Sequence, residues 1–239
     1  MIRKFIPFKI KRFIRILQRG VRDIMARKKF AKEIENKNYD FSIEISQPIF
    51  YNPLSANKIR NIQLATQRIG KVIIKPNETF SFWKIIGNPT KKKGYLTGRN
   101  IIGDELKEDI GGGLCQVSGI IYHLSLIAGL KTLERHCHTI DIYEEENRYT
   151  PLGSDATVVF GFKDLRFINN LDFPIQFDFE VKKDLFTARL CAPNSIRKFN
   201  VTFSRKEMEQ KRVVKTTREI GEITEFVTVS EYRLPKTNI

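Results

Sequence analysis

A cysteine stands where a glycine run meets an apolar stretch, and this junction is the chain's strongest candidate for covalent chemistry. Glycines 111–113 come just before Cys115, and the residues after it repeat apolar positions every three or four until Gly129, as in a buried helix. In the first turn of a helix, unpaired N–H groups and the positive end of the dipole lower the pKa of a thiol. The pattern predicts a nucleophilic thiolate at Cys115.

The glycines can add N–H groups, either as an anion-binding nest or as an oxyanion hole, because glycine lets the backbone turn toward a substrate. The alternative interpretation is an ordinary helix start with Cys115 as a small core residue. If the site is catalytic, the residues expected to bind substrate or an oxyanion are Gly112, Gly113, Gln116, Ser118 and His136.

A thiol nucleophile needs a base, and all three histidines of the chain follow Cys115. His123 lies eight residues further along the same predicted helix, about 12 Å up its axis, so it is expected to pack rather than to act as the base. His136 and His138 lie two apart on a predicted strand and share one face, with Cys137 on the other. Either histidine could reach the sulfur.

An acid that orients the histidine completes this kind of site. Asp155 is placed to be that acid, and Asp141 is the alternative. A cysteine at a helix N-terminus, a histidine on a following strand and a later acid form the arrangement of papain-like and transglutaminase-like thiol enzymes. This comparison is an analogy of architecture.

Zinc binding is a further reading of the same residues, since Cys115, His136, Cys137 and His138 are all possible ligands. Cys137 points away from the two histidines, however, and the chain has no Cys-x-x-Cys clip. We therefore expect no metal and no cofactor, with a zinc-binding protein as the third hypothesis.

Composition indicates a folded body with a basic arm. The chain has 239 residues, 41% of them hydrophobic, and a net charge of +15. Residues 1–32 contain 12 Lys and Arg and one acid, Asp23, so the remaining 30 basic and 26 acidic residues are nearly balanced. Three cysteines are an odd number without framework spacing, which favours free thiols in a reducing compartment.

The arm is expected to form an amphipathic helix after Pro7, with apolar and basic faces typical of a helix that lies on an anionic membrane. The alternative is a helix docked on the body with solvated charges. No aromatic platform accompanies the charge, so we expect no nucleic-acid partner. No stretch is long and apolar enough to span a membrane, and basic residues interrupt any signal peptide. The sequence thus predicts a cytoplasmic protein, peripheral on the inner face of the membrane.

Helical spacing comes early in the chain and strand alternation late, which predicts an α+β fold with a mostly antiparallel sheet packed against helices. Three parts are expected: a basic arm and linker over 1–40, an α+β domain over 41–195 and a C-terminal β extension over 196–239. Besides the arm and the cysteine helix we expect a helix over 55–69. Strands are expected over 41–49, 72–74, 79–83, 130–143, 156–161, 165–168, 175–181, 186–191, 201–204 and 211–231, the last broken at Gly221.

Short motifs between residues 51 and 191 resemble the VanW family, which is named for an accessory gene of vancomycin resistance. The motifs are Asn61-Ile62 with Ala65, Pro76-Asn77-Glu78-Thr79-Phe80-Ser81-Phe82, Gly94-Tyr95, Ile110-Gly-Gly-Gly-Leu-Cys-Gln-Val-Ser118, Glu134-Arg135 followed by His138, and Asp155-Ala-Thr-Val158. The glycine-cysteine-glutamine motif is the most specific of them.

The resemblance implies a role in bacterial cell-wall peptidoglycan metabolism and glycopeptide resistance. The sharpest activity it implies is cysteine-dependent L,D-transpeptidation of peptidoglycan stem peptides. In that activity Cys115 would be the nucleophile and His138 the base, since His138 falls on the motif's histidine. The motifs do not fix the acid.

A peptidoglycan cross-linker works outside the membrane, whereas here we expect the basic arm to stand in place of an export signal. Two hypotheses accommodate that difference. One is a membrane-surface enzyme on the cytoplasmic side that acts on a lipid-linked or soluble wall precursor. The other is a non-catalytic accessory protein that binds such precursors.

Overall fold

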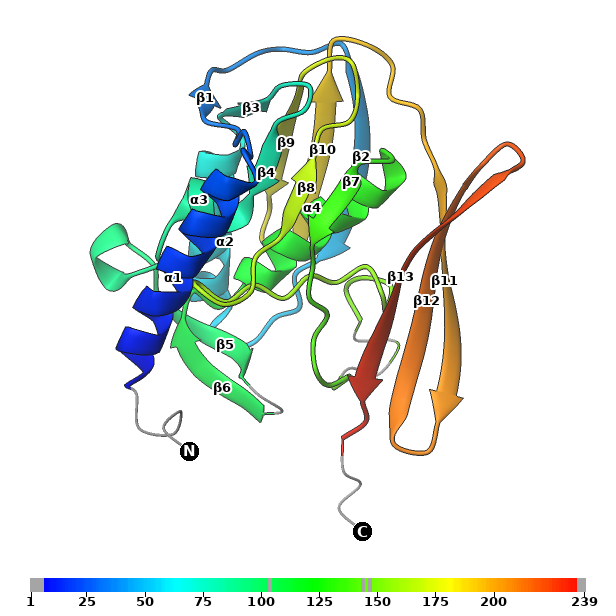
Figure 1. Cartoon of the computed structure of the whole chain (residues 1–239). Helices are drawn as coiled ribbons and strands as arrows, with labels where there is room; N and C mark the ends of the chain where they lie inside the picture. The colour runs from blue at the N-terminus through cyan, green and yellow to red at the C-terminus, as the bar shows by residue number, and fades with distance from the viewer. Residues whose placement is uncertain (1–6, 103–104, 143–144, 146–147, 236–239) are drawn as a thin grey trace.

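An antiparallel sheet with helices on one face forms the centre of the structure (Figure 1), a computed structural model that describes residues 7–102, 105–142, 145 and 148–235. Its strand order is β1-β3-β9-β10-β2, and every neighbouring pair is antiparallel. The predicted α+β class is confirmed. The strands are β1 (Glu33–Ile34), β2 (Phe41–Pro48), β3 (Val72–Ile74), β9 (Ile175–Val181) and β10 (Leu185–Ala192).

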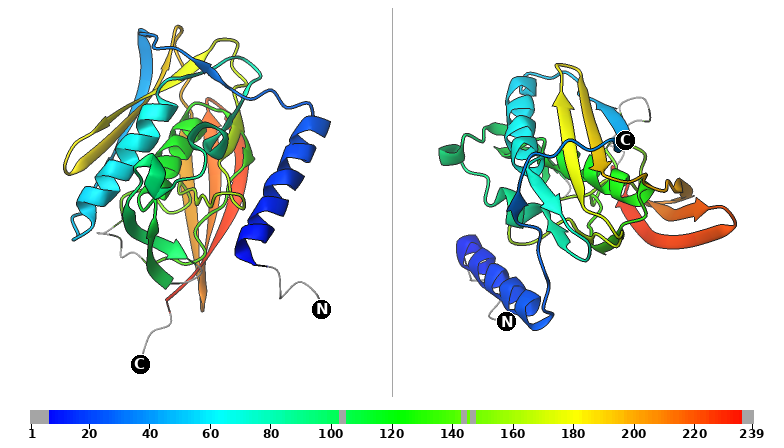
Figure 2. Two further views of the ribbon diagram at one scale, coloured as in Figure 1. Left: turned by 90° about the vertical axis from the view of Figure 1, so that its left-hand side faces the viewer. Right: turned by 90° about the horizontal axis from the view of Figure 1, so that it is seen from above.

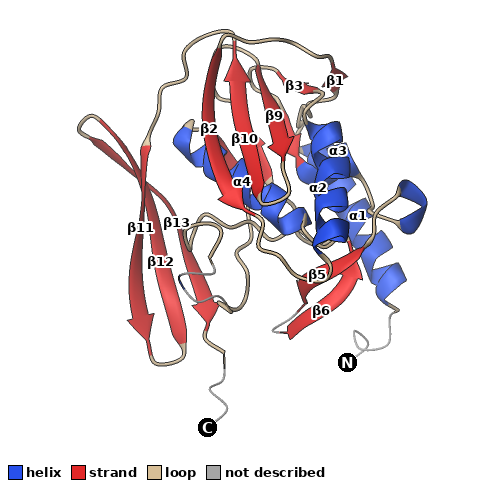
Figure 3. Ribbon diagram, turned by 180° about the vertical axis from the view of Figure 1, so that it is seen from behind, coloured by secondary structure: helices blue, strands red, loops and turns tan. Residues whose placement is uncertain are grey.

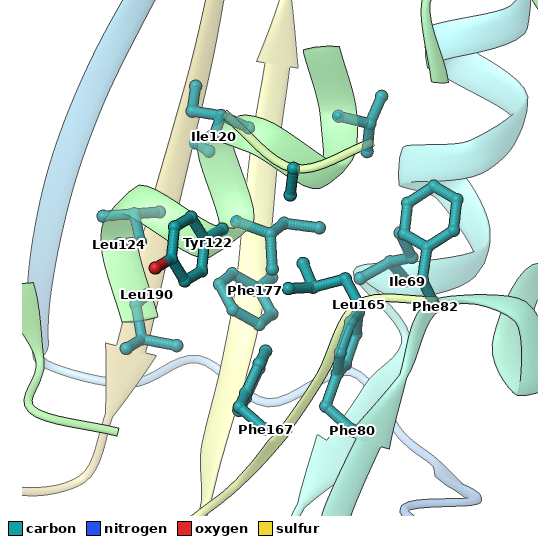
Figure 4. Close-up of a cluster of buried hydrophobic side chains, with 14 of the residues drawn as sticks. Ile69, Phe80, Phe82, Ile120, Tyr122, Leu124, Leu165, Phe167, Phe177 and Leu190 are labelled. Carbon is teal, nitrogen blue, oxygen red and sulfur yellow. The ribbon is translucent and has the colours of Figure 1, made fainter. Parts of the chain in front are cut away.

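Two helices cover this sheet, α2 (Ser55–Ile69) and α4 (Leu114–Ile127), and they also contact each other (Figure 3). Helix α4 is apolar on nearly every side because it lies between the sheet and other elements, the environment in which all-round hydrophobic helices are stable. It ends as expected, with Gly129 at a φ of +70° just beyond its C-terminus. Beneath the helices, Phe80 stacks on Phe167 with ring centroids 4.7 Å apart, and Phe177 packs against both edge-on (Figure 4).

Three smaller sheets complete the fold. Their strand orders are β4-β8-β7, β5-β6 and β11-β12-β13, the last being the long sheet at the edge of Figure 1. The bounds are β4 (Thr79–Ser81), β5 (Thr97–Ile102), β6 (Glu105–Ile110), β7 (Lys131–Glu134), β8 (Arg166–Ile168), β11 (Asn200–Met208), β12 (Lys211–Ile220) and β13 (Ile223–Arg233), with a short helix α3 (Phe82–Ile86) and a 3-10 turn at Lys91–Lys93.

The strand prediction for 130–143 was too long. β7 leaves its sheet at Glu134, where the register against β8 shifts, and Arg135 to His138 continue without a ladder. Position 143 lies outside the described residues. A register shift of this kind re-aims the residues that follow it, and here it directs them toward the start of α4.

Other departures have local causes. Residues 156–161 form a loop, not a strand, because the backbone there contacts α4 and residue 136 instead of a neighbouring strand. The strand expected over 79–83 gives way to α3 after Ser81, whose hydroxyl accepts from the N–H of Lys84 and starts the helix. The β5-β6 hairpin was missed, since its residues do not alternate clearly.

The predicted arm helix is present as α1 (Phe8–Met25), which lies along the outside of the domain (Figure 2). The β11-β12-β13 sheet lies on the opposite side of the molecule from α1 (Figure 1). Within the described residues, no helix combines the length and the apolar character needed to cross a membrane. Residues 1–6 of the arm lie outside the described residues.

Candidate active site

Cys115 is the second residue of α4, and the glycines before it allow the chain to turn sharply into the helix. Gly113 is the N-cap and has a φ of +100°, a conformation that residues with a Cβ rarely adopt. Gly112 lies against Gly98 of β5 so closely that a Cβ on it would come within 2.5 Å of the Gly98 Cα. The glycine run therefore serves a close backbone approach as well as the turn.

The N–H groups of this turn are not equally available. Gly111 donates to the carbonyl of Leu96 at 3.0 Å, and Leu114 donates to the carbonyl of Gly111 at 3.2 Å. By contrast, the Cys115 N–H donates no hydrogen bond to the described residues. The Cys115 amide thus remains free to donate at the N-terminus of the helix, where the dipole favours an anion.

His138 lies beside the sulfur of Cys115, close enough for each side chain to shift the pKa of the other. Its Nδ1 lies 2.7 Å from Oδ2 of Asp155, which leaves Nε2 for the sulfur. The Cys115 Sγ also lies 4.0 Å from the carbonyl oxygen of Val158, a distance too long to decide the protonation state. Cysteine, histidine and aspartate thus form one continuous series.

The surroundings favour a thiolate next to an imidazolium. Burial by itself raises the pKa of the Cys115 thiol, but the interaction with His138 and its positive charge outweigh burial and hold that pKa below its usual value. Burial by itself lowers the pKa of His138, but its hydrogen bond to Asp155 and its interaction with Cys115 raise it to about 10. The lowered pKa of the thiol and the raised pKa of the imidazole both favour the form in which the proton resides on His138.

The carboxylate of Asp155 accepts from four donors. Oδ2 accepts from the backbone N–H of His138 at 2.8 Å as well as from its ring, and Oδ1 accepts from Arg135 at 2.8 Å and from Tyr232 at 2.5 Å. Burial would raise the pKa of Asp155, yet the charge of Arg135 and the bond from His138 keep it well below its usual value. The acid behind His138 is therefore ionised.

Asp141, the alternative acid, lines the same small cavity as His138 and Asp155 but is held by arginines. Its carboxylate is bound by Arg148 at 2.8 and 3.0 Å and by Arg212 at 2.6 Å. Of the two aspartates considered from the sequence, the structure places Asp155 on the histidine.

Two positioning side chains were missed from the sequence. Arg135 is buried; besides the Asp155 carboxylate it bonds the carbonyl oxygens of Asp155 and Gly153 and the hydroxyl of Ser230. Tyr232 comes from β13, which pairs within the C-terminal sheet and is 77 positions from Asp155. Strand alternation is the signal that could have pointed to Tyr232. Along β13, Ser230 and Tyr232 are buried on one face while Val229 and Glu231 are exposed on the other.

His136 and His138 do not share surroundings, contrary to the strand prediction, because the ladder ends before them. The Nε2 of His136 lies 3.1 Å from Oε1 of Glu134, and its side chain is 37% exposed. His123 is mostly buried and packs edge-on against Phe203, and burial lowers its pKa to about 4. The positions separate the three histidines: one at the sulfur, one at the rim and one in the interior.

The remaining expected binding residues lie close to Cys115 but are engaged by the protein. Gln116 is buried and donates to the carbonyl of Pro48 at 3.0 Å. Ser118 is fully buried, and its hydroxyl donates to the carbonyl of Ala156 at 2.5 Å, which ties α4 to the loop that carries Asp155. These contacts suit positioning; substrate or oxyanion binding by Gly112, Gly113, Gln116, Ser118 and His136 stays a prediction.

The site adjoins one small cavity, and its described residues do not form a metal centre. The cavity that touches His138 and Asp155 is small, about 30 Å³, so a peptide substrate would lie over the surface beside it. A larger cavity of about 550 Å³ is lined by Lys32, Arg68, Lys71 and Lys84, well away in the fold between the linker and α2. Among the described residues, no group of three or more His, Cys, Asp or Glu side chains is arranged to hold a metal ion.

Comparison with known proteins identifies a family that covers most of the central sheet and its two helices. A family described as VanW like protein matches residues 57–191, more than half of the chain. The chain belongs to the VanW family. The match contains Cys115, His138, Asp155 and Arg135, while α1 and β13 lie outside it.

Two curated relatives carry this family stretch. One is the uncharacterized protein YoaR of Bacillus subtilis, 38% identical over 126 residues, covering 53% of this chain and 40% of that protein. The other is the vancomycin B-type resistance protein VanW of Enterococcus faecalis, 33% identical over 120 residues, covering 50% of this chain and 44% of that protein. The aligned stretch thus spans less than half the length of either relative. No solved structure matches the chain.

Proposed function

We propose that this VanW-family chain transfers acyl groups through a thioester on Cys115, with peptidoglycan stem peptides or their precursors as the substrate class. The observation that carries the proposal is the series Cys115, His138 and Asp155, in which the His138 ring is hydrogen-bonded to Asp155 and interacts with the Cys115 thiol on its other side. The name of the Enterococcus faecalis relative links the family to vancomycin resistance and so supports a wall-directed substrate.

The chemistry follows from the charges. The Cys115 thiolate attacks the carbonyl carbon of the donor peptide bond, forming a C–S bond and a tetrahedral oxyanion. His138, already protonated, gives its proton to the leaving amine as the C–N bond breaks. An acceptor amine then attacks the thioester while His138 takes its proton, which releases the new amide and regenerates the thiolate. Asp155 holds the ring in the required tautomer throughout.

The oxyanion needs donors that are in place before reaction. The free N–H of Cys115 supplies one, at the positive end of α4. Gly112 and Gly113, which precede it in the same turn, are the expected source of a second. Cys115 is partly exposed, so an extended peptide can approach the sulfur from the surface.

The deciding experiment is incubation of the purified chain with stem-peptide donors, followed by mass spectrometry for an acyl adduct on Cys115. The proposal expects an adduct in the wild type and in Cys191→Ser, none in Cys115→Ala, and slow formation in His138→Ala. Saturable binding of the same peptides without any adduct in the wild type would overturn it in favour of a non-catalytic accessory protein.

A further inference from the structure

Helix α1 turns its apolar side away from the protein. Seven large apolar side chains lie on that side and are between 39% and 79% exposed: Ile10, Phe13, Ile14, Leu17, Val21, Ile24 and Met25. At about 100° per residue, these seven positions fall within roughly 120° of the helix circumference. They form a continuous apolar face, here called the outer face.

The opposite side of α1 docks on the domain, and it does so mainly through charges. Arg19 pairs with Glu134 of β7 at 2.6 Å, and the buried Asp23 pairs with Arg166 of β8 at 2.7 Å. Arg12 lies over the ring of Phe160. Arg12, Arg19 and Asp23 fall within about 40° of one another on the helix and face away from the outer face.

This arrangement inverts the usual one, in which a surface helix buries its apolar stripe against the core. Multiple contacts from β7, β8 and the 158–163 loop hold α1 in that orientation. Figure 2 shows the helix outside the domain with its length open to solvent. The outer face is therefore presented outward by the fold and requires a partner from outside the chain.

Charge identifies the partner. The outer face is bordered by Lys9 on one side and by Lys11, Arg15 and Arg22 on the other, and the one acidic residue of α1, Asp23, is buried in its ion pair. If a second copy packed on the outer face, the basic borders of the two helices would lie against each other, and their like charges would repel. An anionic bilayer satisfies both features, because acyl chains cover the apolar residues and headgroups pair with the basic ones.

We propose that α1 is a membrane-surface anchor that lies in the headgroup region of an anionic phospholipid bilayer, held to the domain by its charged inner side. The inference does not depend on the thiol chemistry. It fixes the orientation of the domain as well as its location, because α1 contacts Glu134, four residues before His138.

Flotation of the full chain with phosphatidylcholine vesicles, with and without phosphatidylglycerol, tests the proposal. Strong binding is expected only with phosphatidylglycerol and should weaken in high salt. The triple variant Phe13→Gln, Leu17→Gln, Val21→Gln should lose at least tenfold in partitioning. The variant Lys11→Gln, Arg15→Gln, Arg22→Gln should lose about fivefold for each charge removed.

Phe226→Gln is the matched control, since Phe226 is also exposed but lies on β13; it should bind as the wild type does. All these side chains are exposed except Lys11, which is partly buried, so thermal unfolding should change little. Equal binding by the apolar triple variant, or no binding to either vesicle, overturns the proposal. So does a dimer in light scattering that the triple variant dissociates, because a second copy would then cover the outer face.

Discussion

Cys115 and Cys191 are both free and partly exposed thiols, but their surroundings shift their pKa values in opposite directions. Cys191 lies in β10 opposite Gln176 and Ser42, and burial together with the negative charge of Asp178 raises the pKa of its thiol. Cys115 is also desolvated, yet His138 lowers its pKa. The comparison teaches that a histidine delivered from a distant segment decides reactivity here, since burial acts in the same direction on both thiols.

The largest effect should be the difference in alkylation rate between the two thiols. At pH 7 Cys191, whose thiol pKa is raised, is at most a few per cent thiolate, so Cys115, whose pKa is lowered, should react with iodoacetamide about ten- to hundredfold faster. Raising the pH should speed Cys191 about tenfold per unit, while Cys115 levels off above its own lower pKa. Peptide mapping by mass spectrometry measures both rates. Equal rates at pH 7 would show that the surroundings of Cys115 do not activate its thiol.

Replacing His138 should make the alkylation rates of the two thiols similar. In His138→Ala burial acts on Cys115 without opposition, so its pKa rises and its rate at pH 7 should fall about ten- to hundredfold. Cys191 should be unaffected. His136→Ala is the control, because His136 contacts Glu134 at the rim, and it should change the Cys115 rate by no more than about twofold. A large loss in His136→Ala would mean that the histidine roles are reversed.

The C-terminal sheet allows a finer test. Tyr232→Phe removes a donor from the ionised Asp155, which should lower the free energy of unfolding by about 1.5–3 kcal/mol and slow Cys115 alkylation a few-fold. In Tyr122→Phe the lost hydroxyl is buried and has no hydrogen-bond partner among the described residues, so stability should hold or improve. Urea unfolding and alkylation are measured on both. Equal stability loss in the two variants would show that ring packing, and not the Asp155 bond, is at work.

The smallest effect is expected at the contact with α1. The pKa of Glu134 is lowered to about 2 by its bonds to His136 and Arg19 despite burial, so the ion pair stabilises above the unfolded value near 4.5 and is lost as pH falls toward 2. Because both side chains are about 20% exposed, Glu134→Gln should cost less than about 1 kcal/mol at pH 7 and nothing near pH 2. Unfolding at the two pH values measures it. Cys115 alkylation should not change, and a change would couple α1 to the site.

Prediction from the sequence succeeded where the signal is local and repeated. Helical spacing located α1 and α4, and alternation located β2, β9 and β10. It failed where the chain leaves a ladder: residues 135–138 and 156–161 were expected to be strands, but contacts with each other and with α4 replace strand pairing. Within the candidate site, Cys115 and the choice of two histidines came from the pattern, and the family resemblance selected His138.

The sequence alone determined which segments are amphipathic, where the basic charge lies, and that a cysteine begins an apolar helix, because each of these depends on neighbours a few residues apart. Only the tertiary structure decided that Asp155 and not Asp141 holds His138, that Tyr232 reaches the same carboxylate from β13, and that α1 turns its charged side inward. These pairings join residues 17 to 143 positions apart. Periodicity says which face of an element is apolar, but what that face meets depends on how the other elements pack around it.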